Sequence, residues 1–339
     1  MLDICSTALP TPKEIKTLFP LENKEFVLSS RTIAKNIFSN KDERFALIVG
    51  PCSIHDERQG FEYGQELKKI SSRSFYPIMR VYCEKPRTTH GWKGLIYDPN
   101  LDGSNDFVDG IIRTRKLLLS LINLNIPCAT EFLDPLIAPY IDDLITWGFI
   151  GARTTASQPH RLLCSGFSFP IGFKNAVDGN VELAIQGAYV AKSPHVFPGI
   201  DQNGLIAKHH SKGNPYSHIV LRGANNFSNH DETSVNKIAK ALEKYKLENR
   251  LIIDCAHGNS QKCHIQQKQV FKEVFSQTLN SNTPIMGIML ESFLKPGSQP
   301  LSEDLEYGVS VTDPCISLEE TQKLIEWAEA LIEEKCLAL

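Results

Sequence analysis

The chain has 339 residues, of which 42% are hydrophobic and 22% charged, the composition of a globular protein. Its net charge of −3 gives no overall field toward nucleic acid or an anionic membrane, and we expect neither as a partner. The apolar stretches are too short to span a bilayer, and the opening residues MLDICSTALPTPKE lack the pattern of a secretory signal. The nine cysteines show no close pairing, so we expect reduced thiols and a cytoplasmic location.

Eight short apolar segments alternate along the chain with helical patterns. Several are apolar throughout, which is typical of parallel strands buried on both faces. The expected strands are Phe45–Val49, Tyr76–Val81, Ile126–Ala129, Phe149–Ala152, Pro170–Phe173, His218–Leu221, Leu251–Ile253 and Ile285–Leu290.

Between these strands, apolar residues recur with helical spacing. Asp106–Leu124 has one apolar stripe and Asp106 as its N-cap, and Ser234–Lys246 has a similar stripe. Ser317–Glu334 opens as Ser-Leu-Glu-Glu, which fits a capping box. The alternation predicts an α/β protein with a (β/α)₈ barrel. A doubly wound sheet is the alternative, because periodicity alone does not separate a closed sheet from an open one.

Three segments exceed a minimal barrel. We expect residues 1–40 to form an N-terminal arm with a helix near Ser30–Phe38, and residues 41–339 to form the barrel itself. Residues 83–105 make a long loop after the second strand, and loops of that length are usually functional or disordered. Residues 193–213 place two short alternating runs around an Asn-Gly turn, which predicts a β-hairpin inserted after the fifth helix.

The arm carries apolar residues that must be covered. We expect them to be buried on a partner subunit of a homo-oligomer, a dimer or a tetramer; the alternative is that the arm plugs the bottom of its own barrel. These residues are Leu18, Phe19, Leu21, Phe26, Val27, Leu28, Ile33, Ile37 and Phe38.

Nearly every expected strand ends on a charged or metal-capable side chain. Four of them are cations: Arg80, Arg153, Lys174 and Arg222. A barrel would aim these cations at one mouth, where like charges repel one another without a partner. They are therefore interpreted as a site for a multiply charged anion, with arginine forks for phosphate or carboxylate. The alternative is that each cation pairs with an acid on a neighbouring helix.

A second set of strand-end residues consists of possible metal ligands. Its members are Cys52, His257, Glu291 and Asp313. A thiolate, an imidazole and two carboxylates would suit one divalent ion of Mn, Fe, Co or Zn. Taken singly, Cys52 could equally be a nucleophile or buried filler, and His257 a structural residue.

Several motifs then resemble one family. The chain is similar to 3-deoxy-D-arabino-heptulosonate-7-phosphate (DAHP) synthase, class I, of the microbial type regulated by aromatic amino acids. The resemblance runs from about Phe19 to the C-terminus, and the block EKPRTT-GWKGL is its most specific part. The motifs are GPCSIHD, MRVYCEKPRTTHGWKGLIYDP, IGARTTASQPHR, PIGFKNAVDG, HIVLRGANN, IDCAHGNSQK, MLESFLKPGSQ and YGVSVTDPCI.

The resemblance implies a (β/α)₈ barrel that condenses phosphoenolpyruvate with erythrose 4-phosphate at the head of the shikimate pathway. It implies one divalent metal per subunit on Cys52, His257, Glu291 and Asp313, so that Cys52 is a ligand and not a nucleophile. The phosphoenolpyruvate positions it implies are Arg80, Lys85, Arg153, Lys174 and Arg222, and the erythrose 4-phosphate positions are Lys85, Arg87 and Thr88.

For this reaction we expect three catalytic side chains. Lys85 would assist at the aldehyde oxygen, Glu131 would orient or deprotonate a water, and His257 would act beside the metal. His90 and Ala176-Val177 depart from the usual family residues but replace no implied ligand. An aromatic amino acid is implied as an inhibitor, bound near Leu163, Ser168 and the 193–213 hairpin.

Other functions remain open from the sequence. One is a sibling enzyme that joins phosphoenolpyruvate to another sugar aldehyde such as arabinose 5-phosphate, which the KPRTT block disfavours. A second is a non-catalytic barrel that senses aromatic acids. A third is a structural-zinc scaffold, which would need four closed ligands and no ring of cations.

Overall fold

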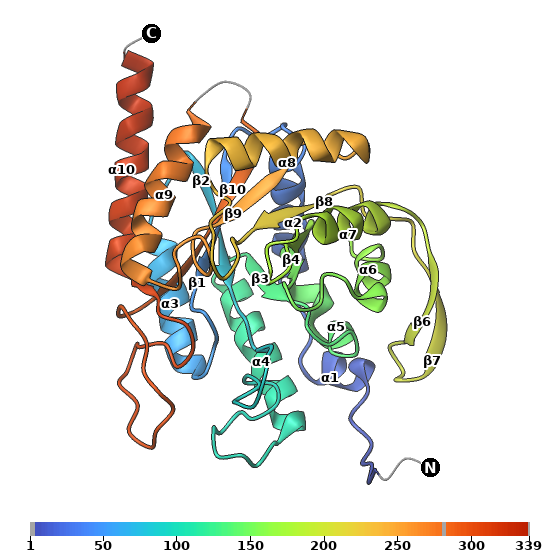
Figure 1. The fold of residues 1–339 in the computed structure, drawn as a ribbon. Coiled ribbons are helices and arrows are strands. Elements are labelled where there is room, and N and C mark those ends of the chain that lie inside the picture. The colour runs from blue at the N-terminus through green and yellow to red at the C-terminus, as the bar shows by residue number, and fades with distance from the viewer. Residues whose placement is uncertain (1–3, 280–282, 338–339) are drawn as a thin grey trace.

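The computed structural model describes residues 4–279 and 283–337, and in this part of the chain eight parallel strands close into a barrel (Figure 1). Neighbours pair in the order β1-β2-β3-β4-β5-β8-β9-β10, and β10 pairs back onto β1. The expected (β/α)₈ barrel is confirmed. The strands are β1 (Phe45–Gly50), β2 (Phe75–Arg80), β3 (Cys128–Glu131), β4 (Trp147–Ile150), β5 (Ile171–Lys174), β8 (Ser217–Leu221), β9 (Leu251–Asp254) and β10 (Ile285–Phe293).

Helices surround the barrel, and their ends follow the capping residues. Asp106 accepts from the backbone N–H of Asp109 at the start of α4, and Ser317 and Glu320 form the expected reciprocal cap of α10. The helices are α3 (Glu57–Lys69), α4 (Phe107–Asn123), α5 (Ala138–Ile141), the 3₁₀ turn η1 (Asp142–Leu144), α6 (Gln158–Cys164), α7 (Glu182–Lys192), α8 (Glu232–Lys244), α9 (His264–Thr278) and α10 (Leu318–Leu337); the short strand β11 (Ile316–Ser317) precedes α10.

Several element boundaries differ from expectation: β3 and β5 begin two residues and one residue later in the chain, and β4, β10 and α8 differ as well. β4 begins at Trp147 and ends at Ile150, because Trp147 lies in the barrel interior and Gly148 leaves room for the ring of Phe132. β10 extends to Phe293, where it pairs with β11. α8 begins at Glu232, because Asp231 caps it through the backbone N–H of Ser234.

The arm is built into the barrel of its own chain. Helix α2 (Lys24–Ile37) starts earlier than expected, and Ala34, Ile37 and Phe38 pack among interior strand residues. The Ser30 and Thr146 hydroxyls are 2.7 Å apart, just ahead of β4. This helix therefore closes the amino end of the barrel, which agrees with the alternative reading of the arm.

A first helix, α1 (Pro12–Leu18), was not predicted. Its signal is present in the sequence as the Thr11–Glu14 capping box with Pro12 at the first helical position. The Lys13 N–H donates to Gln202 O at 2.8 Å, so α1 touches the turn of the inserted hairpin.

The expected hairpin is confirmed after α7. Strands β6 (Val196–Ile200) and β7 (Ile206–His210) are antiparallel and lie at the side of the barrel, away from its axis (Figure 1). Ile206 at its tip is 87% exposed, and Leu18 and Leu28 of the arm are also exposed. No helix in residues 4–279 and 283–337 is long and apolar enough to cross a membrane.

Candidate active site at the carboxyl ends of the strands

A cavity of about 270 Å³ opens where the carboxyl ends of the barrel strands converge. It is lined by six lysine or arginine side chains against two carboxylates, which leaves it strongly positive. Nine of the sequence-predicted site residues line it: Lys85, Arg87, Thr88, Glu131, Arg153, Lys174, Arg222, His257 and Asp313. The other three, Cys52, Arg80 and Glu291, are buried next to these residues.

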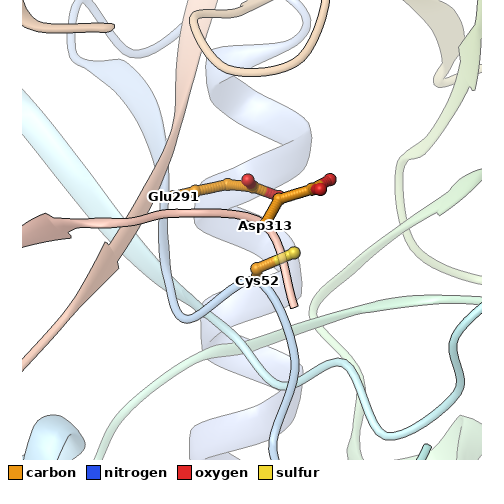
Figure 2. Close-up of side chains that lie close together, drawn as sticks. All are labelled: Cys52, Glu291 and Asp313. Atoms are coloured by element: carbon orange, nitrogen blue, oxygen red, sulfur yellow. The ribbon is translucent and has the colours of Figure 1, made fainter. Parts of the chain in front are cut away.

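Cys52, Glu291 and Asp313 form a compact group (Figure 2). Cys52 follows β1, Glu291 lies on β10 and Asp313 lies in the loop before β11. One possible ligand atom from each lies within 4.8 Å of the others. A thiol with two carboxylates is a donor set for a divalent transition metal, as the sequence predicted for these three.

His257, the fourth predicted ligand, stands beside this group and is not part of it. It follows β9 with a left-handed backbone, φ 56°. Its Nε2 lies 3.6 Å from Glu291 Oε1, and its Nδ1 lies 2.9 Å from Asp254 Oδ2. The imidazole thus lies between one carboxylate that could share a metal and another at ion-pair distance, although its Nδ1 makes no hydrogen bond of ordinary geometry in the described residues.

Cys52 has a cationic neighbour. Lys85 Nζ lies 3.1 Å from Cys52 Sγ and 3.2 Å from the Cys52 carbonyl oxygen. Burial and the charge of Glu291 raise the pKa of the Cys52 thiol, and Lys85 opposes them. Without a further cation the thiol therefore stays protonated near neutral pH.

Two of the predicted cations pair with buried acids of the site itself. Arg80 Nη2 lies 3.0 Å from Glu291 Oε1, and Lys174 Nζ lies 2.6 Å from Asp254 Oδ2. Neither partner is on a helix surface, so the alternative of surface pairing does not hold for these two. Burial alone would raise the pKa of Asp254, but His257 and Lys174 hold it well below its usual range.

The remaining two cations keep free hydrogen-bonding capacity. Arg222 is buried, and its Nη1 has no partner among the described residues. Arg153 is exposed and donates from Nε to Thr88 Oγ1 at 3.0 Å. A buried guanidinium nitrogen without a partner is costly, so the arrangement fits an anionic ligand.

Glu131, at the end of β3, is 7% exposed, and its Oε1 has no hydrogen-bond partner in the described residues. A Cβ at Gly151 would lie only 2.0 Å from that oxygen, so the carboxylate depends on a glycine there. A water or substrate in the cavity could satisfy Oε1.

The long loop after β2 folds back on itself. The Lys85 N–H donates to Lys93 O at 2.8 Å, and Arg87 Nε donates to Trp92 O at 2.7 Å. Behind it, Tyr97 Oη lies 3.4 Å from both Glu84 Oε1 and Asp134 Oδ2, and burial together with Asp134 raises the pKa of Glu84 well above its usual range. The loop is therefore a folded wall of the cavity.

Two charged residues of the site had no role in the sequence analysis. Asp254 directly follows the expected strand Leu251–Ile253, and it contacts both Lys174 and His257. Lys262 lines the cavity, with Nζ 3.6 Å from Asp313 Oδ1. Strand position pointed to Asp254, whereas Lys262 lies in an irregular loop without a periodic signal.

Comparisons with known proteins agree on one family. The family model described as "DAHP synthetase I family" matches residues 19–326. "Phospho-2-dehydro-3-deoxyheptonate aldolase, Tyr-sensitive" from Salmonella typhimurium is 44% identical over 326 residues, covering 94% of this chain and 91% of that protein. The Trp-sensitive protein of the same name from Escherichia coli K12 is 41% identical, covering 94% and 93%.

A solved structure shares the fold over nearly its full length. It is that of phospho-2-dehydro-3-deoxyheptonate aldolase from Francisella tularensis SCHU S4, which is 42% identical, with a TM-score of 0.94 over 97% of this chain and 98% of that one. The motifs, the barrel and these matches lead to one assignment. This chain belongs to the DAHP synthetase I family.

Proposed function

We propose that this chain condenses phosphoenolpyruvate with erythrose 4-phosphate to form DAHP and inorganic phosphate, the first step of aromatic amino acid biosynthesis. The observation that carries the proposal is the strongly cationic cavity beside a thiol and two carboxylates in a member of this family. The substrates bring several negative charges, which the excess of lysine and arginine would balance.

Phosphoenolpyruvate would lie between β4 and β8. Arg153, Lys174 and Arg222 face the cavity from three strand ends, and Arg222 has a free Nη1. Lys85 lines the same cavity, and Arg80 is buried beside it, where it pairs with Glu291. These two residues complete the set. Arginine forks suit both the phosphate and the carboxylate of this substrate.

Erythrose 4-phosphate would lie against the wall formed by residues 85–90. Lys85, Arg87 and Thr88 line the cavity there. Because Thr88 accepts a hydrogen bond from Arg153, the two substrate positions adjoin. That proximity suits a bond between one carbon of each substrate.

The donor set fits a divalent metal. Cys52, Glu291 and Asp313 would hold it with His257, which contacts Glu291, and Mn, Fe, Co and Zn are all compatible with these ligands. When bound, such an ion supplies Lewis-acid polarisation of the aldehyde oxygen.

The chain's own side chains would manage the protons. C3 of phosphoenolpyruvate forms a bond to the aldehyde carbon, and Lys85 Nζ gives a proton to the resulting alkoxide. Glu131, with its free Oε1, takes a proton from the water that adds at C2. The C2–O bond to phosphate then breaks while the new C2 hydroxyl becomes the ketone, and its proton leaves with the inorganic phosphate. His257 would be kept in orientation by Asp254.

A second cavity supports feedback control by an aromatic amino acid. It measures about 660 Å³ and lies between the α5–α6 region and the hairpin, with Leu163, Phe167, Phe197 and His209 in its lining. Ser168 follows the lining residue Phe167, and its Oγ accepts a hydrogen bond from Arg31 Nη1 at 3.0 Å. Relatives whose names state Tyr or Trp sensitivity are consistent with this role.

Assembly is part of the same proposal. The hairpin tip and Leu18 expose apolar surface, and α1 of the arm contacts the hairpin turn through the Lys13 N–H and Gln202 O. A homodimer or homotetramer would cover this surface. We assign catalysis to residues 41–339 and a structural role to α2, which closes the amino end of the barrel. The segment before α2 would serve feedback inhibition and subunit association.

The deciding experiment measures inorganic phosphate released from phosphoenolpyruvate by purified protein with Mn²⁺. We expect release with erythrose 4-phosphate and at most a small fraction of that rate with arabinose 5-phosphate. The reverse preference would assign the chain to the sibling reaction. No release with either aldehyde would favour a non-catalytic sensor.

A further inference from the structure

Three buried asparagines lie directly behind the cationic strand ends. Asn175 follows β5, Asn229 lies between β8 and α8, and Asn259 follows β9. They are 0%, 4% and 4% exposed, respectively, and stand outside the lining of the active-site cavity. Neutral amides buried in one cluster must find partners for their donors and acceptors.

Asn175 directly follows the last residue of β5 that pairs with β8, and its backbone and side chain extend the contact between the two strands. The last paired residues are Lys174 and Val220, and the Asn175 N–H then donates to Val220 O at 3.2 Å. The Asn175 side chain makes two further hydrogen bonds to β8 and its loop. Its Oδ1 accepts from the Arg222 N–H at 2.9 Å, and its Nδ2 donates to Gly223 O at 3.0 Å. One amide thus holds the backbone on both sides of Arg222.

Asn229 extends this clamp. Its Nδ2 donates to Asn175 Oδ1 at 3.2 Å, and its Oδ1 accepts from the Gly223 N–H at 2.8 Å. Its own backbone N–H donates to Asn259 Oδ1 at 2.8 Å. The link therefore runs from β5 across β8 toward β9.

Asn259 completes the link. Its Nδ2 donates to Asp254 O at 2.9 Å and to Leu221 O at 3.2 Å. The Arg222 carbonyl oxygen accepts from the Gly258 N–H at 2.9 Å and from the Asn259 N–H at 3.2 Å. Both the N–H and the C=O of Arg222 are thereby held by this cluster.

We propose that Asn175, Asn229 and Asn259 are positioning residues for phosphoenolpyruvate, because they fix the backbone of Arg222 and so aim its guanidinium into the cavity. The inference rests on the proposed function, since it assigns Arg222 to that substrate. Neutral amides suit the task because they satisfy the backbone and add no carboxylate that could neutralise Arg222.

A purely structural role is the competing explanation, and Asn214 provides a matched control. It is 1% exposed, its Nδ2 donates to Phe169 O at 2.9 Å, and its Oδ1 accepts from the Tyr216 N–H at 3.0 Å. It precedes β8, at the opposite end of the strand from Arg222. Removing it would cost stability without reaching the cavity.

The test is the kinetics of Asn175→Ala and Asn214→Ala in the full chain. A misplaced binding group can cost roughly ten- to a hundredfold, and we expect that rise in the KM and Kd for phosphoenolpyruvate in Asn175→Ala. The KM for erythrose 4-phosphate should change by no more than about twofold. Asn214→Ala should lower the melting temperature and leave both KM values unchanged. Equal rises for both substrates, or the same rise in Asn214→Ala, would overturn the proposal.

A double-mutant cycle with Arg222→Ala separates action through Arg222 from a general effect. In the Arg222→Ala background, Asn175→Ala should add no further loss of phosphoenolpyruvate affinity. If the affinity losses of the two single variants multiply in the double variant, the proposal is wrong. If Asn175→Ala does not fold, Asn229→Ala removes the acceptor for the Gly223 N–H without adding a carboxylate near Arg222, and it faces the same readouts. A wild-type protein without phosphate release would refute the proposed function instead.

Discussion

Lys85 Nζ lies 3.1 Å from Cys52 Sγ. Because Lys85 also lines the active-site cavity, it connects that cavity with the group formed by Cys52, Glu291 and Asp313. Burial raises the pKa of the Cys52 thiol, together with the charge of Glu291. A metal would reverse that balance, because a coordinated thiol is deprotonated and the cation offsets the two nearby carboxylates.

We therefore expect catalysis to require a divalent metal and Cys52→Ser to abolish tight metal binding. A serine hydroxyl keeps the approximate size but lacks a thiolate. Treatment with EDTA should remove activity, and add-back of Mn²⁺ should restore it only in the wild type. Metal content and phosphate release are the two measurements.

Cys128→Ser is the control for this prediction. Cys128 is also buried, but the one hydrogen bond of its Sγ among the described residues goes to Ile126 O, at 3.5 Å, near the start of β3. This variant should lose some stability and keep its metal. Full activity in metal-free wild-type protein would exclude metal dependence.

The two substrates should respond to different arginines. Arg222→Ala should raise the KM for phosphoenolpyruvate far more than that for erythrose 4-phosphate, and Arg87→Ala should do the reverse. Loss of a hydrogen bond to a charged group costs roughly 1.5–3 kcal/mol, or about ten- to a hundredfold in affinity. Steady-state kinetics with each substrate varied in turn will measure the split.

Arg153→Ala serves as the comparison for that pair. Its guanidinium donates to Thr88, so its removal should weaken phosphoenolpyruvate most and also disturb erythrose 4-phosphate. If Arg222→Ala and Arg87→Ala affect both substrates alike, the division of the cationic cavity between them is wrong.

The strand pattern was a good guide to the barrel because its strands are nearly all apolar and separated by amphipathic helices. It was also a good guide to the site, since a closed barrel brings strand ends together whatever lies between them. Nine of the twelve predicted residues line one cavity, with Glu131, Arg153, Lys174 and Arg222 at strand ends and Arg87 and Thr88 in the loop after β2. Their roles came from the family motifs and not from spacing.

Contacts between side chains and irregular backbone could not be predicted in this way. The hydrogen bond from the Arg222 N–H to Asn175 Oδ1 joins residues 47 apart in a region without periodicity. His257 adopts a left-handed backbone that sequence spacing does not reveal. The arm was hardest, because its apolar residues would fit either a partner or the barrel bottom, and only packing distinguishes them.

The position of α1 leads to a prediction about control. Deletion of residues 1–22 removes α1 and its contact with Gln202 but spares α2. Catalysis should persist, whereas association and inhibition by phenylalanine, tyrosine or tryptophan should weaken. Light scattering and inhibitor titration will test both.

Phe38→Ala is the control for this deletion, because Phe38 caps the C-terminus of α2, which the deletion spares. Phe38 is fully buried, and loss of such a ring costs about 3–5 kcal/mol of stability. This variant should be less stable in urea while its inhibition profile stays that of the wild type. If the truncated protein keeps its oligomeric state and its full inhibition, α1 serves neither association nor feedback control.

The last prediction concerns acid stability at the amino end of the barrel, where His218 is buried. Its ring stacks on Phe38 with centroids 4.1 Å apart, its Nδ1–H donates to Tyr216 O at 2.9 Å, and its Nε2 accepts from Trp147 Nε1 at 3.1 Å. Burial lowers the pKa of His218 to about 3. The native ring therefore stays neutral at pH values where the unfolded chain already binds a proton.

Stability must then fall as the pH drops below the unfolded value of about 6.5, and the loss continues toward pH 3. Between pH 7 and pH 5 this group should remove about 2 kcal/mol from the free energy of unfolding. His218→Gln keeps a donor and an acceptor but cannot titrate, so it should be less stable at pH 7 and lose about 2 kcal/mol less than the wild type on acidification. Urea titrations of both proteins at pH 7 and pH 5 give the two differences directly, with the carboxylates common to both acting as an internal reference. Parallel losses in the two proteins would mean that His218 is protonated in the native barrel or plays no part in its acid sensitivity.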